Sequence, residues 1–91
     1  MEIILKEGII WETTIPYSQQ SEECQQLIQS ICSETPDSML YEDPSTTLPR
    51  VLEETFNYNN NKIIKTITYL YPYTNRRSGL IKNINYNVQE I

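Results

Sequence analysis

The chain has 91 residues, of which 38% are hydrophobic and 21% are charged, and its formal net charge is -5. This length and composition are typical of one small globular domain rather than of a disordered tail, and the longest apolar runs fall far short of the roughly 20 residues that span a bilayer. Residues 1–8 lack the basic region and long apolar stretch of a secretory signal, so we expect a soluble protein of the cytoplasm.

The charge is unevenly divided along the chain. Residues 1–49 contain nine Asp or Glu side chains against Lys6 alone, whereas residues 50–91 contain six Lys or Arg side chains against three Glu. Such an asymmetry bears on partners and solubility rather than on fold. We therefore expect the N-terminal half to attract a basic partner.

Residues 1–15 are predicted to form a β-hairpin. Two segments rich in β-branched and aromatic residues, 1–5 and 9–15, flank a short loop that ends in Gly8. Glycine suits the positive φ that a tight hairpin loop requires. Pro16 is expected to end the second strand, because proline has no N–H to donate to a sheet.

A helix is predicted over about residues 18–35. Ser18 or Ser21 is suited to cap its start, and Glu22 and Glu23 favour the positive end of its dipole. Apolar residues recur at helical spacing and define one stripe. The members of that stripe are Cys24, Leu27, Ile28, Ile31 and Cys32.

The two cysteines of this stripe are predicted to be free. Eight residues of helix rise about 12 Å, whereas the Cα atoms of a disulfide lie within about 7 Å of each other. Cys24 and Cys32 cannot pair in that geometry. We expect them to be small buried side chains of a protein in a reducing compartment.

The C-terminal part is predicted to be mostly β. Residues 36–49 contain three prolines and are expected to form a long loop. Residues 50–91 show strand patterns separated by a turn at residues 59–61 and a loop at 72–79, which predicts a three-stranded antiparallel meander. The predicted fold is a single α+β domain of order ββαβββ, with one helix on one face of a mostly antiparallel sheet.

The sequence offers little equipment for catalysis. It contains no histidine and only two glycines, so the usual general base, the commonest metal ligand and the glycine-rich phosphate loops are absent. We therefore expect no enzyme activity, no cofactor and no metal site. A small-molecule enzyme that uses carboxylates stays open as a separate alternative, although a chain of this size has little room for a deep pocket.

Two groups of residues are candidate binding sites. The first group is acidic and suits a partner protein with a basic cleft: Glu22, Glu23, Asp37, Glu42 and Asp43. The second group combines aromatic and basic side chains, which bind nucleic acid and are also enriched at protein interfaces: Tyr69, Tyr71, Tyr73, Arg76 and Arg77.

Two functions follow as alternatives. The first is a small acidic protein-binding module, with a profile typical of inhibitors that viruses or mobile elements direct against a host defence or nucleic-acid-handling protein. The second is direct binding of nucleic acid or a nucleotide through the C-terminal sheet and the loop that contains Arg76 and Arg77. A homodimer through an exposed edge strand or the tyrosine-bearing face is a further option. No membrane association is expected.

Overall fold

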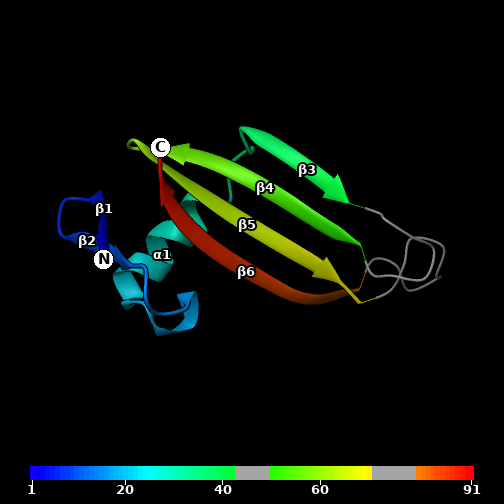
Figure 1. The fold of residues 1–91 in the computed structure, drawn as a ribbon, viewed down its shortest axis with the longest axis horizontal. Helices are drawn as coiled ribbons and strands as arrows, with labels where there is room; N and C mark the ends of the chain where they lie inside the picture. The colour runs from blue at the N-terminus through cyan, green and yellow to red at the C-terminus, as the bar shows by residue number, and fades with distance from the viewer. Residues whose placement is uncertain (43–49, 71–79) are drawn as a thin grey trace.

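The computed structural model describes residues 1–42, 50–70 and 80–91, and it shows the predicted α+β class (Figure 1). One helix accompanies a two-stranded hairpin, β1-β2, and a four-stranded antiparallel sheet of order β3-β4-β5-β6. The elements in chain order are β1 (Glu2–Lys6), β2 (Ile9–Glu12), the 3-10 turn η1 (Tyr17–Gln19), α1 (Glu22–Ile31), β3 (Ser38–Glu42), β4 (Val51–Tyr58), β5 (Asn61–Tyr69) and β6 (Ile81–Glu90).

The predicted hairpin forms, but its second strand ends at Glu12 and not at Pro16 as predicted, because residues 13 and 14 form a turn. The two faces of the hairpin differ in burial. Gly8 has the expected positive φ of 79°, and Ile3 pairs with Trp11 across the strands. Ile3 and Trp11 are buried, whereas the next pair along the hairpin, Ile4 and Ile10, is exposed. Because successive strand residues point to opposite faces, the hairpin buries one face and leaves an isoleucine pair on the other.

The helix is shorter than predicted at both ends. Its N-cap is Ser21, whose side chain accepts from the Cys24 N–H at 3.2 Å. Ser18 belongs instead to η1, and Gln20 between the two elements has an extended backbone with φ -69° and ψ 163°. The helix ends at Ile31, four residues before the predicted end at residue 35. The cap at Ser21 and the extended Gln20 explain why the helix does not begin at residue 18.

A fourth strand corrects the prediction of an uninterrupted loop over residues 36–49. β3 pairs with β4 from Ser38 opposite Thr55 to Glu42 opposite Val51. The apolar segment 39–41 has strand propensity, and the prolines at positions 36 and 44 lie outside the strand, so no ladder donor is lost. Residues 43–49 lie outside the described part of the chain.

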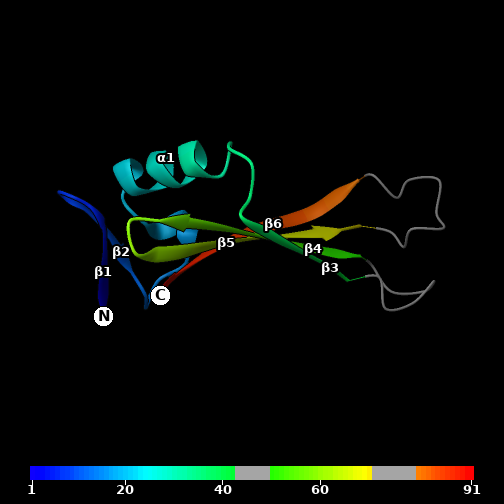
Figure 2. The ribbon, with the colours of Figure 1, turned by 90° about the horizontal axis from the view of Figure 1, so that it is seen from above.

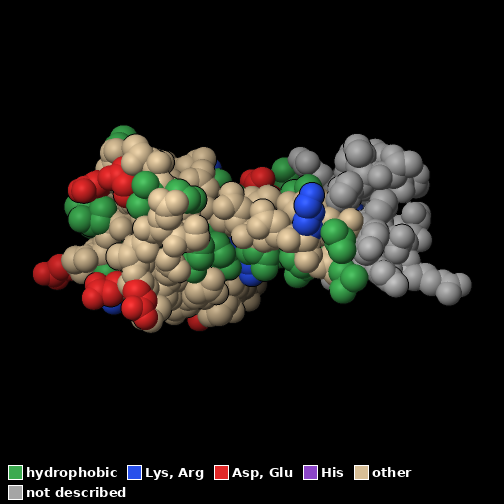
Figure 3. Space-filling model, turned by 90° about the horizontal axis from the view of Figure 1, so that it is seen from below, with side chains coloured by type: hydrophobic (Ala, Val, Ile, Leu, Met, Phe, Trp, Pro, Cys, Tyr) green, Lys and Arg blue, Asp and Glu red, His purple; other side chains and the backbone are tan. Residues whose placement is uncertain are grey.

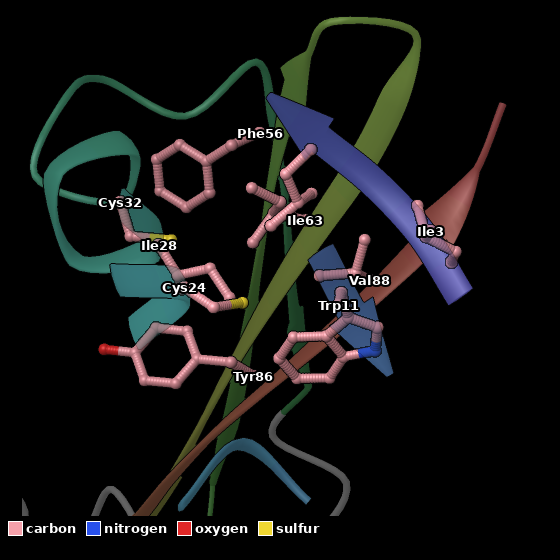
Figure 4. Close-up of a cluster of buried hydrophobic side chains, with 10 residues drawn as sticks. Ile3, Trp11, Cys24, Ile28, Cys32, Phe56, Ile63, Tyr86 and Val88 are labelled. Atoms are coloured by element: carbon pink, nitrogen blue, oxygen red, sulfur yellow. The ribbon is translucent and has the colours of Figure 1, made fainter. Parts of the chain in front are cut away.

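The helix stripe packs against the four-stranded sheet and the hairpin, as Figure 4 shows. Cys24 and Ile28 of α1 are fully buried, and they face Phe56 of β4 and Ile63 of β5. The hairpin closes the same cluster from the side. The buried cluster consists of Ile3, Leu5, Trp11, Cys24, Ile28, Cys32, Phe56, Ile63, Tyr86 and Val88.

The turn between β4 and β5 fastens the hairpin to the sheet. Asn59 and Asn60 have positive φ values of 48° and 65°, which asparagine tolerates. The Asn59 side-chain amide donates to the Leu5 carbonyl at 2.9 Å, and the Asn61 amide donates to the Ile4 carbonyl at 2.9 Å. The predicted asparagine turn is confirmed at Asn59 and Asn60, whereas Asn61 already begins β5. The side chains of Asn59 and Asn61 additionally join two separate sheets.

α1 covers only one end of the larger sheet. Figure 2 shows that the sheet extends well beyond the helix. Phe56, Ile63 and Val88 are lateral partners beneath the helix. Further along the strands, on the same face, a second set of lateral partners crosses all four strands. We call this set the apolar row, and it consists of Tyr41, Leu52, Ile67 and Ile84.

Candidate functional site

The acidic candidates are distributed along the molecule rather than gathered in one cluster. Glu22 and Glu23 are exposed in the first turn of α1, where their charge complements the helix dipole. Asp37 lies beyond the opposite end of the helix, which rises about 15 Å over its ten residues. Glu42 is the last residue of β3, and Asp43 lies outside the described residues.

Asp37 has a structural role at the edge of the sheet. Its backbone N–H donates to the Thr55 carbonyl at 2.8 Å, and its carboxylate accepts from the Asn57 N–H at 2.6 Å. The carboxylate therefore accepts a hydrogen bond from a β4 N–H group, that of Asn57, which lies just beyond the end of the β3–β4 pairing. This hydrogen bond gives the Asp37 carboxylate a role within the fold that needs no partner protein.

The structure does gather carboxylates at the end that carries the hairpin and α1. Figure 3 shows the acidic side chains concentrated there. Lys6 is the only Lys or Arg in residues 1–34. We call the exposed carboxylates of this region the acidic end. They are Glu2, Glu7, Glu22 and Glu23 of the N-terminal segment, together with Glu90 at the end of β6.

Glu12 differs from these residues because it is already paired. Its Oε1 accepts from the N-terminal ammonium of Met1 at 3.0 Å and from the Thr14 N–H at 3.2 Å. The hydrogen bond from the ammonium, followed by that from Thr14, lowers the pKa of Glu12 below its usual value. Its charge serves to close the hairpin.

An open hollow of about 410 Å³ lies within the acidic end, between the hairpin and the β4–β5 turn. The side-chain bonds of Asn59 and Asn61 to β1 hold its two walls together. Two carboxylates in one concavity suit a lysine ammonium or an arginine guanidinium. Its lining residues include Glu2, Ile4, Asn59, Asn60 and Glu90.

Sequence reasoning missed Glu2 and Glu90 as members of one site. They stand near opposite ends of the chain and belong to different sheets. No local pattern connects them, because only the docking of the hairpin onto the β4–β5 turn brings them together. The asparagines at positions 59–61 were the only hint in the sequence. They predicted a turn, and not the attachment of the hairpin to that turn.

Tyr69 is the member of the aromatic and basic group that the structure describes. The Arg50 guanidinium lies 4.2 Å from the centroid of the Tyr69 ring and 5.9 Å from that of Tyr41, and Arg50 Nη1 donates to the Tyr41 hydroxyl at 3.0 Å. This arrangement covers one side of the Tyr69 ring with a cation. Tyr71, Tyr73, Arg76 and Arg77 lie outside the described residues.

The cysteines are buried, free thiols, as predicted. Burial raises the pKa of Cys24, and it raises the pKa of Cys32 to about 11 although Lys65 opposes the shift. Both thiols therefore stay protonated near neutral pH. A nucleophilic or metal-binding cysteine has to be a thiolate. Within residues 1–42, 50–70 and 80–91, no group of three metal-ligating side chains forms a metal site.

Comparisons with known proteins do not assign the chain to a family, because no family model, curated protein or solved structure matches it. In the described part of the chain, no helix has the length and apolar character needed to cross a membrane.

Proposed function

We propose that this protein is a small protein-binding module whose acidic end engages a basic surface of another protein. The observation that carries this proposal is the concentration of exposed carboxylates around the hairpin and α1, with a hollow that contains Glu2 and Glu90. Opposite fields accelerate association and orient the two partners before contact.

The hairpin supplies the apolar part of the same contact. Ile4 is 65% exposed and Ile10 is 40% exposed, and the two side chains are cross-strand partners. Ile4 also lines the acidic hollow. An apolar centre with a charged rim is the usual anatomy of a protein interface, so a lysine or arginine of the partner in the hollow would lie beside a desolvated isoleucine pair.

The specific form of the proposal is an inhibitor that occupies a nucleic-acid-binding cleft. Carboxylates that meet a basic cleft replace the phosphates that the cleft normally binds. The inhibitor and a nucleic acid then exclude each other from the partner. A viral or mobile-element origin is part of this specific form of the proposal.

The experiment is affinity capture by the full chain from its native host, followed by titration of the purified captured protein. We expect the double variant Glu2→Gln, Glu90→Gln to bind at least about tenfold more weakly, because each lost ion pair at an interface costs on the order of 1 kcal/mol or more. A short DNA duplex is expected to compete with the protein for the captured partner.

The control is Glu53→Gln, which removes one carboxylate from β4, outside the acidic end. It is expected to leave the affinity unchanged. Unchanged binding by the Glu2 and Glu90 double variant, and by Glu22→Gln with Glu23→Gln, would contradict the proposal. Direct binding of the protein to oligonucleotides at low salt, with a steep loss as salt rises, would favour the nucleic-acid alternative instead.

A further inference from the structure

The face of the four-stranded sheet that points away from α1 carries polar side chains next to the hairpin. On β6, Tyr86 and Val88 belong to the buried cluster beneath the helix, so the residues that alternate with them point to the opposite face. The segment 13–16 leaves β2 and passes on this opposite side of the sheet, as Figure 2 shows. An open hollow of about 480 Å³ lies between that segment and the sheet. We call it the polar hollow.

Five polar side chains line the polar hollow, and they extend in two directions from one residue, Asn85. Across the strands, Asn85, Thr66 and Glu53 are lateral partners on β6, β5 and β4, at a spacing of about 4.8 Å. Along β6, Asn85, Asn87 and Gln89 are alternate residues, at a spacing of about 7 Å. In the part of the chain that the structure describes, none of these five side chains makes a hydrogen bond. The hollow therefore presents donors and acceptors that the fold itself does not use.

Trp11 adds a buried donor to the wall of the polar hollow. Its side chain is 2% exposed, and its Nε1 has no hydrogen-bond partner among the described residues, although a buried indole N–H usually has one. Figure 4 shows this nitrogen on the side of the ring away from Tyr86 and α1, which is the side of the polar hollow. The nitrogen is covered by neighbouring atoms, so an acceptor in the hollow reaches it when a side chain rotates. The amides of Asn87 and Gln89 in the same wall are exposed.

We propose that the polar hollow binds a saccharide. A saccharide ring carries hydroxyl groups on most of its carbons, and each hydroxyl both donates and accepts hydrogen bonds. The amides of the hollow can serve both functions, the Glu53 carboxylate accepts from hydroxyl groups, and the Trp11 indole donates. Ile64 and Pro16 also line the hollow and supply an apolar surface for the C–H groups of the ring, as ligand pockets typically do.

The charge and the shape of the polar hollow favour a saccharide over other ligands. Among the described residues that line it, none is Lys or Arg, so a phosphate group or a nucleic acid would find no counter-charge and would meet the Glu53 carboxylate. An extended peptide presents its N–H and C=O groups along a single line, whereas the polar groups here extend both along β6 and across three strands from Asn85. The volume is also within the range of small-molecule sites.

The test is an NMR titration of the ¹⁵N-labelled full chain with four monosaccharides: D-glucose, D-galactose, D-mannose and N-acetyl-D-glucosamine. Trp11 is the only tryptophan of the chain, so one indole resonance reports on the wall of the hollow. We expect at least one sugar to shift this resonance and the side-chain amide resonances of Asn85 and Asn87 saturably. The Kd is expected to be on the order of 1–10 mM, because the ligand is small and the hollow is open.

Two substitutions are expected to weaken this binding without affecting the fold, and one matched substitution is not. Asn85→Ala removes the exposed amide at which the two directions meet, and we expect it to raise the sugar Kd about fivefold or more. Glu53→Gln replaces the carboxylate by a weaker acceptor and is expected to raise the Kd as well. Asn83→Ala is the matched control, because Asn83 is an exposed amide on the same face of β6 that does not line the hollow. We expect it to leave the Kd unchanged.

Glycerol at the same concentration of hydroxyl groups and the uncharged peptide N-acetyl-trialanine amide complete the test, and neither is expected to shift the indole resonance saturably. Absence of a saturable shift with all four sugars, an equal shift with glycerol, binding of the peptide in place of a sugar, or equal effects of Asn85→Ala and Asn83→Ala would overturn the proposal. These outcomes are independent of the acidic end. Glu53→Gln is expected to weaken sugar binding and to leave the captured protein bound, whereas the Glu2 and Glu90 double variant is expected to do the reverse.

Discussion

Gln20 is the buried polar residue that joins the hairpin to the helix. Its side-chain oxygen accepts from the Glu12 N–H at 3.0 Å, and its amide nitrogen donates to the carbonyls of Glu12 at 2.7 Å and Ile15 at 3.0 Å. Three main-chain groups therefore depend on a side chain that is 6% exposed. In the sequence, Gln20 is one polar residue in a polar segment, and only its position after the hairpin gives it this role.

We expect Gln20→Ala to lower the free energy of unfolding by about 2–3 kcal/mol, because it leaves three backbone groups without their partner. The measurement is urea denaturation followed by circular dichroism. Gln19→Ala changes the exposed neighbour and is expected to stay within about 0.5 kcal/mol of the original protein. Equal effects of the two substitutions would contradict this role of Gln20.

The buried thiol of Cys32 makes stability depend on pH in the alkaline range. Burial raises its pKa from the usual 9.0 to about 11, so the unfolded chain releases this proton first. The contribution is complete below pH 9.0 and is lost as the pH rises through about 11. A shift of this size corresponds to at most about 3 kcal/mol. We expect Cys32→Ala to lose less stability than the original protein between these pH values, as measured by urea denaturation.

Tyr86 has a raised pKa as well, again because of burial. It is present in both proteins, so the comparison isolates the thiol. An identical alkaline loss in the two proteins would contradict the assignment to Cys32.

At the level of elements, local signals predicted the hairpin, the helix stripe and the asparagine turn. Gly8 supplies the positive φ of the hairpin, and Cys24 and Ile28 are buried at the predicted helical spacing. β3 was missed because a short strand between prolines resembles a loop. Its place is decided by pairing with β4 and by the Asp37 bond to the Asn57 N–H, and such long-range contacts leave no periodic pattern in the sequence.

The β4–β5 turn gives a prediction at the same scale. Asn60 has φ of 65°, a conformation that costs a β-branched residue about 1–2 kcal/mol. We expect Asn60→Val to lower the unfolding free energy by about that amount and Asn60→Gly to change it by only a few tenths of a kcal/mol. Thermal or urea denaturation measures both, and a Val variant as stable as the Gly variant would contradict the positive φ.

At the level of the whole molecule, the structure separates two surfaces. The acidic end lies at the hairpin and α1, whereas the apolar row lies on the part of the sheet beyond the helix (Figures 2 and 3).

The sequence by itself determined the α+β class, the burial of the cysteine-bearing helix stripe, the asparagine turn and the charge difference between the two halves. Each of these depends on residues that are close in the chain, where spacing and propensity act directly. Tertiary structure decided which carboxylates share a hollow, because Glu2 and Glu90 meet only when the hairpin docks on the turn. It also decided that the apolar row lies beyond α1, because a helix of ten residues reaches over only one end of the sheet.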